Sequence, residues 1–448
     1  MARLFGTDGV RGKAGESPLD RATVRRLGAA LARALREGDG TVRFLAGRDT
    51  RESGGWIERE LAFGIRSQHG ILTSAGVIPT PAIAYLTPRM AYTAGVVISA
   101  SHNPFDDNGI KVFSGAGEKF TEALEQRVEA IVADASWAVP AGDAGPVEEI
   151  DYRDAYVGHL LEILPPALRR RELRVVIDCA NGATTTVAPR VFDELGVDVR
   201  CIGSAPDGRN INLRCGSTAP EGLAQAVVSG QYDLGIAYDG DGDRAILVDA
   251  QGRIVDGDAV MLMCAKQMKA EGRLKGDAIV ATVMSNIGLE IALREDGIGL
   301  VRCQVGDKYV MEEMLRRGLV LGGEQSGHVI FSDYLFTGDG LATSLNVLRT
   351  MAASGRSLAD LASDLTTYPQ VLMNLRVRQK VDLNMIPEIA AVIARVEQHL
   401  AGHGRLLVRY SGTEPLLRVM LEGRDESEIR TLGQEIIDAV REHVGAAA

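Results

Sequence analysis

The 448-residue sequence predicts an α/β protein, with three comparable α/β segments followed by a smaller α+β segment. Apolar runs of strand length alternate with apolar residues at helical spacing, which is typical of sheets covered by helices. This alternation starts again twice, the first time after a stretch rich in Pro, Ala and Gly around residues 140–146. The chain is also longer than a single core usually supports, so several domains are expected.

The first segment shows the alternation most clearly. Leucine and valine side chains recur at helical spacing over residues 19–35, and TVRFLAG at 41–47 is typical of a short strand. A helix over 56–65, a strand from Ile71 and the strand AGVVISA at 94–100 complete it.

The second and third segments repeat the pattern with different sequences. LRVVIDCANGA (173–183) predicts a strand, a loop and the start of a helix, and DLGIAYDGDGD (233–243) predicts a strand that enters an acidic loop. The third segment contains AIVATVMSN (278–286), LVRCQVGDKYV (300–310) and LVLGGEQSGHVIF (319–331). No residue-by-residue internal repeat accompanies this similarity of type.

The last segment begins near residues 368–369 and predicts a small α+β domain. Strands are expected at 371–381, 404–410 and 416–423, with a helix over 384–400 and a closing helix. Alternating apolar residues in the last two strands indicate a sheet with one solvated face. We place the four domains at 1–150, 151–255, 256–368 and 369–448.

The amino-acid composition argues against some classes of function. The 49 Lys and Arg residues against 60 Asp and Glu give a formal charge of -11, which argues against a nucleic-acid binder or a protein that lies on anionic membranes. Local arginine clusters can still bind anionic small molecules. The sequence contains five cysteines, an odd number, and no CxxC pair, so we expect reduced thiols and no framework of disulfides. No signal-peptide pattern or membrane-span pattern occurs, and a cytoplasmic location is expected.

The segment DGDGDR, residues 239–244, follows a predicted strand. Asp239, Asp241 and Asp243 alternate with glycines that permit a tight turn, so three hard oxygen ligands can point at one cation such as Mg²⁺. An EF-hand loop is excluded, because it requires Gly at position six and Glu at position twelve. A solvated acidic turn is the other alternative. Because Mg²⁺ often takes a phosphate oxygen, Arg244 is a candidate to grip the same phosphate.

The segment SASHNP, residues 99–104, also follows a predicted strand, and its Pro prevents a helix from starting there. A serine beside His102 is a candidate nucleophile if a base, a metal or a strong electrophile activates it. Alternatively, its serines and Asn103 only form a polar turn. The sequence contains no GxSxG elbow, so acyl transfer is not favoured. Spacing alone does not decide between Ser99 and Ser101.

Two further motifs offer groups that suit a sugar substrate. Lys111, in DDNGIKVF, is a candidate acid or base, because a neighbouring guanidinium can shift its pKa toward a useful value; the alternative is a surface lysine. Glu324 and Ser326, in GEQSGH, lie on a glycine-flanked loop suited to adjacent sugar hydroxyls.

The segment RYSGTEP, residues 409–415, has the donor-rich composition of a phosphate nest. Its candidate groups, together with one arginine that follows, are Arg409, Ser411, Gly412, Thr413 and Arg418. Each motif alone is compatible with a turn. Together they predict a metal-bound phosphate, a second phosphate site and a site for sugar hydroxyls.

Five motifs, in this order along the whole chain, resemble the α-D-phosphohexomutase family: FGTDGVRG, SASHNPFDDNGIK, DGDGDR, GGEQSGH and SGTEPLLRVM. The resemblance implies three related α/β domains with mixed sheets and a smaller C-terminal α+β domain around a central cleft. The residues of the first and fourth motifs are similar to those of one branch of the family. That branch interconverts glucosamine 6-phosphate and glucosamine 1-phosphate, on the route to UDP-N-acetylglucosamine and cell-wall precursors. This implies one Mg²⁺ per chain, a bisphosphosugar as intermediate and activator, and a homodimer.

The resemblance also implies roles for single residues. It makes Ser101 a phosphoserine that ligates Mg²⁺ together with the three aspartates. Arg11 and Arg244 would steady that phosphate, and His102 and Lys111 would assist proton transfer. The groups that would bind the rest of the substrate are Glu324 and Ser326 for sugar hydroxyls, and Arg409, Ser411, Gly412, Thr413 and Arg418 for the phosphate that is not reacting.

Two positions depart from the family pattern. In VGDKYV, Lys308 stands where the family commonly has arginine. This residue is expected to contact the substrate, and lysine offers a single point charge in place of the forked hydrogen-bond donor of arginine. Tyr410 occupies a place that often carries lysine.

Three other functions remain alternatives for a chain with these motifs. The nearest is the same chemistry on mannose or glucose phosphates. A non-catalytic sugar-phosphate sensor with the same fold is the second, and the presence of Ser101 and all three aspartates argues against it. A phosphatase or bisphosphate synthase is the third.

Overall fold

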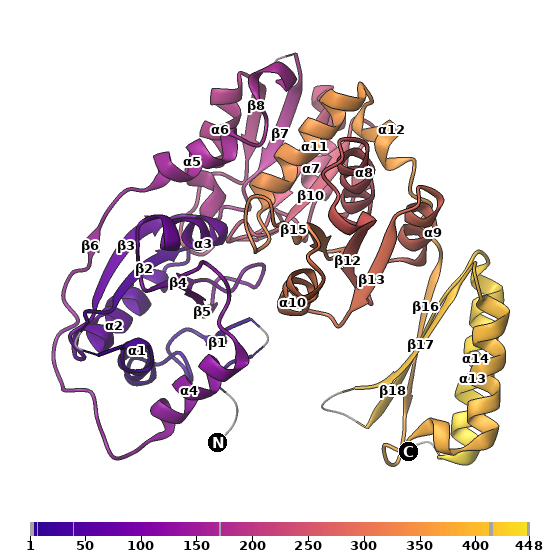
Figure 1. Cartoon of the computed structure of the whole chain (residues 1–448), viewed down its shortest axis with the longest axis horizontal. Helices are drawn as coiled ribbons and strands as arrows, with labels where there is room; N and C mark the ends of the chain where they lie inside the picture. The colour runs from indigo at the N-terminus through magenta and orange to yellow at the C-terminus, as the bar shows by residue number, and fades with distance from the viewer. Residues whose placement is uncertain (1–3, 7, 39, 170–171, 412–414, 446–448) are drawn as a thin grey trace. The chain divides into compact units, whose positions relative to one another are not determined.

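The computed structural model separates into two compact units, each built from sheets and helices (Figure 1). Unit 1 contains residues 1–284 and 301–363, and unit 2 contains residues 285–300 and 364–448. The residues that the structure describes are 4–6, 8–38, 40–169, 172–411 and 415–445. The structure divides into these two compact units only. The predicted domain boundaries at residues 150, 255 and 368 therefore stay a prediction.

The first sheet of unit 1 is mixed, with strand order β1-β5-β4-β2-β3-β6. Strands β4, β2, β3 and β6 pair in parallel, and β5 pairs antiparallel with β4 and β1. Its strands are β1 (Val10–Lys13), β2 (Arg43–Arg48), β3 (Ile71–Val77), β4 (Ala94–Ile98), β5 (Asp107–Ser114) and β6 (Glu148–Glu149). Its helices are α1 (Arg21–Leu35), α2 (Gly54–Arg66), α3 (Thr80–Arg89) and α4 (Glu122–Ala133).

Helices cover both faces of this sheet. Side chains of α1 and α2 share a hydrophobic cluster with Phe44 and Val96. On the opposite face, α3 packs so closely that a Cβ atom at Gly47 would lie 2.7 Å from the side chain of Ile83. Strand β4 is therefore fully buried, as its continuous apolar run predicts. Its carboxyl end delivers the SASHNP loop.

The second sheet has strand order β11-β10-β9-β7-β8, and the third has β13-β12-β14-β15. The strands are β7 (Arg174–Asp178), β8 (Asp198–Ile202), β9 (Leu234–Tyr238), β10 (Ala245–Asp249), β11 (Ile254–Val255), β12 (Ala278–Thr282), β13 (Gly299–Cys303), β14 (Leu321–Gly323) and β15 (Val329–Phe331). The helices are α5 (Arg153–Leu161), α6 (Ala188–Leu195), α7 (Glu221–Gly230), α8 (Gly257–Ala270), α9 (Ile287–Glu295), α10 (Asp307–Arg317), α11 (Gly340–Ser354) and α12 (Leu358–Ala362). In both sheets a polar motif follows a buried strand, β9 in one and β14 in the other.

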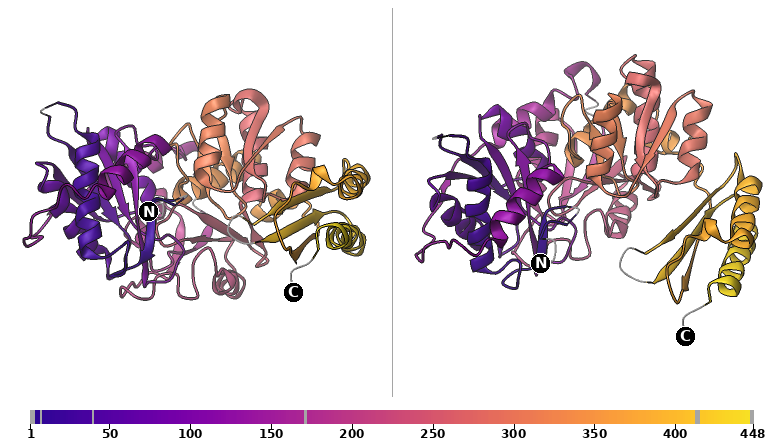
Figure 2. Two further views of the ribbon diagram at one scale, coloured as in Figure 1. Left: turned by 90° about the horizontal axis from the view of Figure 1, so that it is seen from below. Right: turned by 60° about the horizontal axis from the view of Figure 1, so that its bottom comes forward.

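Most of unit 2 is a three-stranded antiparallel sheet with helices on one face (Figure 2). Strands β16 (Gln370–Arg376), β18 (Leu416–Glu422) and β17 (Arg405–Tyr410) lie in that order, and helices α13 (Pro387–Leu400) and α14 (Glu426–His443) cover them. Leu417, Val419 and Leu421 point toward the helices and form the core. The residues between them in sequence therefore point to the other face.

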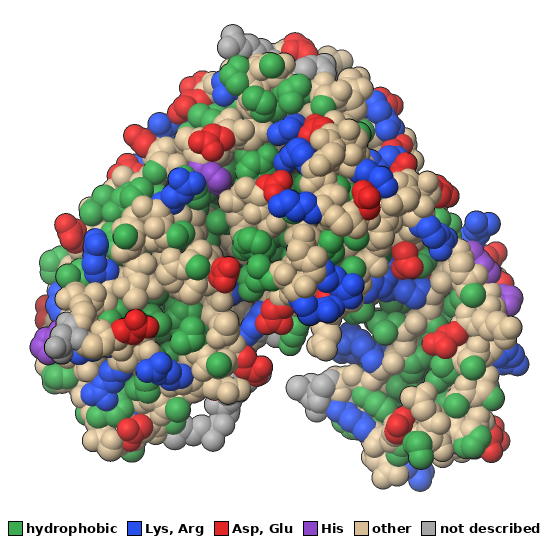
Figure 3. Space-filling view, viewed as in Figure 1, with side chains coloured by type: hydrophobic (Ala, Val, Ile, Leu, Met, Phe, Trp, Pro, Cys, Tyr) green, Lys and Arg blue, Asp and Glu red, His purple; other side chains and the backbone are tan. Residues whose placement is uncertain are grey.

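The predicted fold class is confirmed, including the mixed sheets and the small C-terminal α+β part. The strand β5 was missed, because its first residues are Asp107, Asn108 and Gly109, which are poor strand formers. All five cysteines have free thiols. No helix in the described ranges is both long and apolar enough to cross a membrane. Positive and negative side chains are interspersed over the face seen in Figure 3.

Candidate active site

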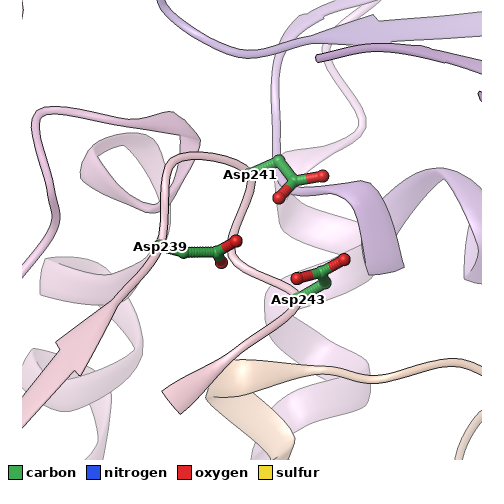
Figure 4. Close-up of side chains that lie close together, drawn as sticks. All are labelled: Asp239, Asp241 and Asp243. Carbon is green, nitrogen blue, oxygen red and sulfur yellow. The ribbon is translucent and has the colours of Figure 1, made fainter. Parts of the chain in front are cut away.

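Three buried aspartates form the centre of the site in unit 1. Asp239, Asp241 and Asp243 follow β9, and each offers a carboxylate oxygen within 4.8 Å of the others (Figure 4). Glycine at 240 is required because a Cβ atom there would lie 2.6 Å from the carbonyl oxygen of Ser101. Gly242 has a φ of 74°, in the left-handed region. The alternation of Asp and Gly thus lets a tight loop approach the SASHNP segment.

The three carboxylates fit a divalent cation. Oδ1 of Asp241 and Oδ1 of Asp243 are buried and accept no hydrogen bond from the described residues. Burial and the charges of Asp243 and Asp241 raise the pKa of Asp239 well above its ordinary value. Because mutual repulsion and desolvation both oppose three ionised carboxylates here, a cation that takes oxygen ligands would offset both.

The two serines of SASHNP point to different partners. Ser101 Oγ donates a 2.5 Å hydrogen bond to Asp239, and the Ser101 backbone has a φ of 52°. Ser99 Oγ donates to Asp49 at 2.5 Å and accepts from the Ser101 N–H at 2.9 Å. Ser99 therefore stabilises the unusual backbone of Ser101, and only the Ser101 hydroxyl reaches the carboxylate cluster.

Two side chains from distant segments hold this loop by its carbonyl groups. Arg51 donates to the carbonyl oxygens of Ser101 (3.3 Å) and Asn103 (2.5 Å). Asn212 donates to the same oxygens at 2.9 and 3.1 Å. Sequence reasoning missed both residues, because neither belongs to a recognisable motif.

Lys111 extends from β5 into the carboxylate cluster. Its Nζ lies 2.9 Å from Asp241, 3.3 Å from Asp243 and 3.1 Å from Asp8. Burial alone would lower the pKa of Lys111, but Asp241, Asp8 and Asp243 raise it well above its ordinary value. The expectation that a guanidinium would lower this pKa was wrong, since three carboxylates outweigh Arg11.

His102 lies beside the Ser101 hydroxyl, with 3.3 Å between Nδ1 and Oγ. Burial, Arg244 and Arg11 lower the pKa of His102, so the neutral ring is favoured. This ring can therefore accept a proton from the hydroxyl.

The two predicted phosphate-binding arginines also reach this region. Arg11 pairs with Asp8, and Arg244 lies 3.8 Å from Asp243. The Nε atom of each arginine is buried without a hydrogen-bond partner among the described residues. An anion at this site would satisfy these donors.

The residues expected to contact the sugar lie in the third sheet and its loops. Glu324 accepts a hydrogen bond from the Gly306 N–H at 3.1 Å, and Ser326 is exposed. Lys308, in α10, forms an ion pair with Glu125 at 3.2 Å. Its ammonium group is therefore already engaged by a carboxylate.

In unit 2, Arg409 and Arg418 are directly opposite each other on β17 and β18. Like charges at opposed positions destabilise a sheet, and Nε of Arg418 is buried without a partner in the described part of the chain. An anion bound by both arginines would offset this cost. Ser411 is buried, and its carbonyl accepts a hydrogen bond from Lys380 at 2.6 Å. Gly412 and Thr413 lie outside the described residues.

Three further residues contact the carboxylates or the lysine beside them. Thr80 Oγ1 donates to Asp241 at 2.5 Å, and His328 Nδ1 lies 3.7 Å from Asp243. Asp8 contacts Lys111, as described above. Asp8 lies in the motif FGTDGVRG and His328 in GEQSGH, so the sequence motifs could have identified both as site residues. Thr80 is the first residue of α3 and belongs to no motif, so the sequence could not have identified it.

Comparison with known proteins identifies the family. Models of phosphoglucomutase/phosphomannomutase match four consecutive parts: α/β/α domain I at residues 2–138, α/β/α domain II at 154–252, α/β/α domain III at 256–368 and the C-terminal domain at 372–439. The phosphoglucosamine mutase of Syntrophotalea carbinolica is 48% identical over 449 residues, covering 99% of this chain and 98% of that protein. That of a Geobacter species is 47% identical over 452 residues, covering 100% of both.

A solved structure has the same fold. A phosphoglucomutase/phosphomannomutase family protein from Burkholderia thailandensis, 24% identical, superposes with a TM-score of 0.81 over 99% of this chain and 98% of that chain. The fold, the four family models and the full-length similarity agree. The chain belongs to the phosphoglucosamine mutase family.

Proposed function

We propose that this enzyme interconverts glucosamine 6-phosphate and glucosamine 1-phosphate, with Ser101 as the carrier of the phosphoryl group. The observation that carries the proposal is the buried Ser101 hydroxyl, which donates into a cluster of three buried carboxylates. The amino sugar is supported by the relatives, whose printed names give phosphoglucosamine mutase over the full length of the chain. The product would supply synthesis of UDP-N-acetylglucosamine and cell-wall precursors.

Two phosphoryl transfers complete one cycle. In the first, the bond from phosphorus to Ser101 Oγ breaks while a bond to the C1 oxygen of glucosamine 6-phosphate forms, giving glucosamine 1,6-bisphosphate and a free serine. In the second, Ser101 takes the phosphoryl group from the C6 oxygen, which leaves glucosamine 1-phosphate. The C1 hydroxyl loses a proton and the C6 oxygen gains one, so the cycle is balanced.

The side chains divide this work among them. His102, with its neutral ring favoured, takes the Ser101 proton in the second transfer and returns one in the first. Arg11, Arg244 and the Lys111 ammonium supply positive charge beside the transferring group, which is what phosphoryl transfer chiefly requires. Mg²⁺ held by the three aspartates would neutralise further charge on that phosphate.

The remaining predicted residues would hold the substrate. Arg409 and Arg418 would bind the phosphate that is not reacting, together with Ser411 and the backbone beside it. Glu324 and Ser326 would read the sugar hydroxyls.

The proposal is tested by turnover and by intact mass. Purified enzyme is given glucosamine, glucose or mannose phosphates with a trace of the matching bisphosphosugar, and we expect the glucosamine phosphates to give the highest kcat/KM. A tenfold or greater preference for glucose 1-phosphate would contradict the assignment. The mass should show one phosphate, absent from Ser101→Ala. Protein that never carries phosphate and behaves like Ser101→Ala would instead be a sugar-phosphate sensor.

A further inference from the structure

A second buried lysine, Lys119, shares the carboxylate of Asp8 with Lys111. Lys119 Nζ contacts Asp8 at 2.6 Å and also pairs with Asp307, and its side chain is only 12% exposed. Although burial favours the neutral amine, Asp307 and Asp8 raise the pKa of Lys119 above its ordinary value. Lys119 is therefore a buried cation with a carboxylate on each side.

Each carboxylate that contacts Lys119 also contacts a residue of the active site. Oδ1 of Asp8 accepts from Lys119, and Oδ2 of Asp8 lies 3.1 Å from Lys111 Nζ. Oδ2 of Asp307 lies 3.5 Å from Nε2 of His328. Lys119 thus has one neighbour that places Lys111 and another that lies against His328.

The contacts close into a circuit around the site. Lys111 and His328 both reach Asp243, at 3.3 and 3.7 Å. In order, the circuit contains Lys111, Asp8, Lys119, Asp307, His328 and Asp243. Its members come from all three sheets of unit 1 or from the loops beside them, and Asp307 is the first residue of α10. Displacement of Lys119 would therefore leave two carboxylates, Asp8 and Asp307, without the cation that they share, and these carboxylates contact Lys111 and His328.

We propose that Lys119 is a positioning residue of the mutase reaction, which with Asp8 and Asp307 holds Lys111 and His328 against the metal-binding carboxylates. This inference rests on the proposed function, since it concerns the rate of that reaction. Lys119 acts through its neighbours and does not touch the reacting atoms. Its ion pairs set position, because a buried carboxylate that loses its partner must move or take up a proton.

The test compares Lys119→Met, which keeps most of the stem but removes the charge, with Lys119→Arg, which keeps the charge. Lys275→Met, at an exposed position of the same unit, is the control. We expect Lys119→Met to lower kcat by about 30- to 100-fold with KM changed less than threefold, since small displacements in an active site cost about this much. Lys119→Arg should recover kcat to within about tenfold of wild type.

Asp307→Asn should resemble Lys119→Met, and the double variant should be no slower than the slower single variant, because the pair acts as one unit. Three results would overturn the inference: Lys119→Met within twofold of the control, a higher KM with unchanged kcat, or equal losses of kcat and melting temperature in Lys119→Met and Lys119→Arg. Wild-type enzyme that turns over no hexose phosphate would instead overturn the proposed function. The two failures are therefore distinct.

Discussion

Ser101 and Asp239 are 138 residues apart in the sequence, yet the Ser101 hydroxyl donates a 2.5 Å hydrogen bond to the Asp239 carboxylate. Each residue follows a fully buried strand, Ser101 after β4 and Asp239 after β9. Polar loops at the carboxyl ends of such strands are where α/β sheets keep their ligand sites. A phosphate on Ser101 would thus lie beside the loop of three aspartates.

The first prediction separates the two serines of the loop. Ser101→Ala should lower kcat by at least about a thousandfold and abolish the phosphate seen by intact mass, because the acceptor oxygen is gone. Ser99→Ala should still become phosphorylated but lose about 10- to 100-fold in kcat, because the Ser101 N–H loses its acceptor. The prediction would be contradicted if Ser101→Ala kept its phosphate and Ser99→Ala lost it, because Ser99 would then be the phosphate carrier.

The second prediction concerns metal removal. Chelation should abolish turnover, and Mg²⁺ should raise the melting temperature, because a ligand at a hundred times its Kd contributes about 2.7 kcal/mol to stability. Asp241→Asn should lose this response while Asp277→Asn, at an exposed position, keeps it. An equal Mg²⁺ response in both variants, measured by differential scanning fluorimetry, would place the cation elsewhere.

The third prediction is a conflict between stability and binding at Arg418. Arg418→Met should raise KM for both sugar phosphates by about tenfold or more, since a charged hydrogen bond contributes about 1.5–3 kcal/mol. It should also raise the melting temperature of the phosphate-free enzyme slightly, because the repulsion from Arg409 is removed. The exposed Arg424→Met serves as control. A normal KM in Arg418→Met would exclude this pair of arginines from phosphate binding.

The fourth prediction concerns Asp339, which caps α11 and accepts hydrogen bonds from the Ala342 N–H at 3.0 Å and the Tyr156 hydroxyl at 2.7 Å. Burial raises the pKa of Asp339 to about 6, although these bonds oppose the shift. Because this folded-state pKa exceeds the unfolded value of about 3.9, the protonated group stabilises the fold below about pH 4, and this contribution is lost as the pH rises through about 6.

The variant Asp339→Asn keeps the cap and the acceptor but does not titrate. Its melting temperature relative to wild type should therefore increase between about pH 4 and pH 7, by an amount that corresponds to roughly 3 kcal/mol at about 1.4 kcal/mol per pKa unit. Thermal unfolding of both proteins across this range provides the measurement. A difference that does not change with pH would show that Asp339 titrates normally.

Much of the fold could be predicted because its signals are local. The apolar run before residue 99 and the helical spacing over 19–35 each depend on a few neighbouring residues, and both predictions are confirmed by β4 and α1. The strand β5, which carries Lys111, was missed since its pairing with β4 and β1 outweighs the weak propensity of its first residues.

The sequence by itself determined the fold class, the family motifs and the loop that collects three carboxylates, because alternating Asp and Gly sets the local backbone. Only the tertiary structure decided which serine faces that loop. It also decided that three carboxylates raise the pKa of Lys111 and that Lys119 contacts both Asp8 and Asp307. These facts depend on contacts between segments that lie up to 188 residues apart, as for Lys119 and Asp307. The packing of the sheets of unit 1, and no local property of the chain, brings such segments together.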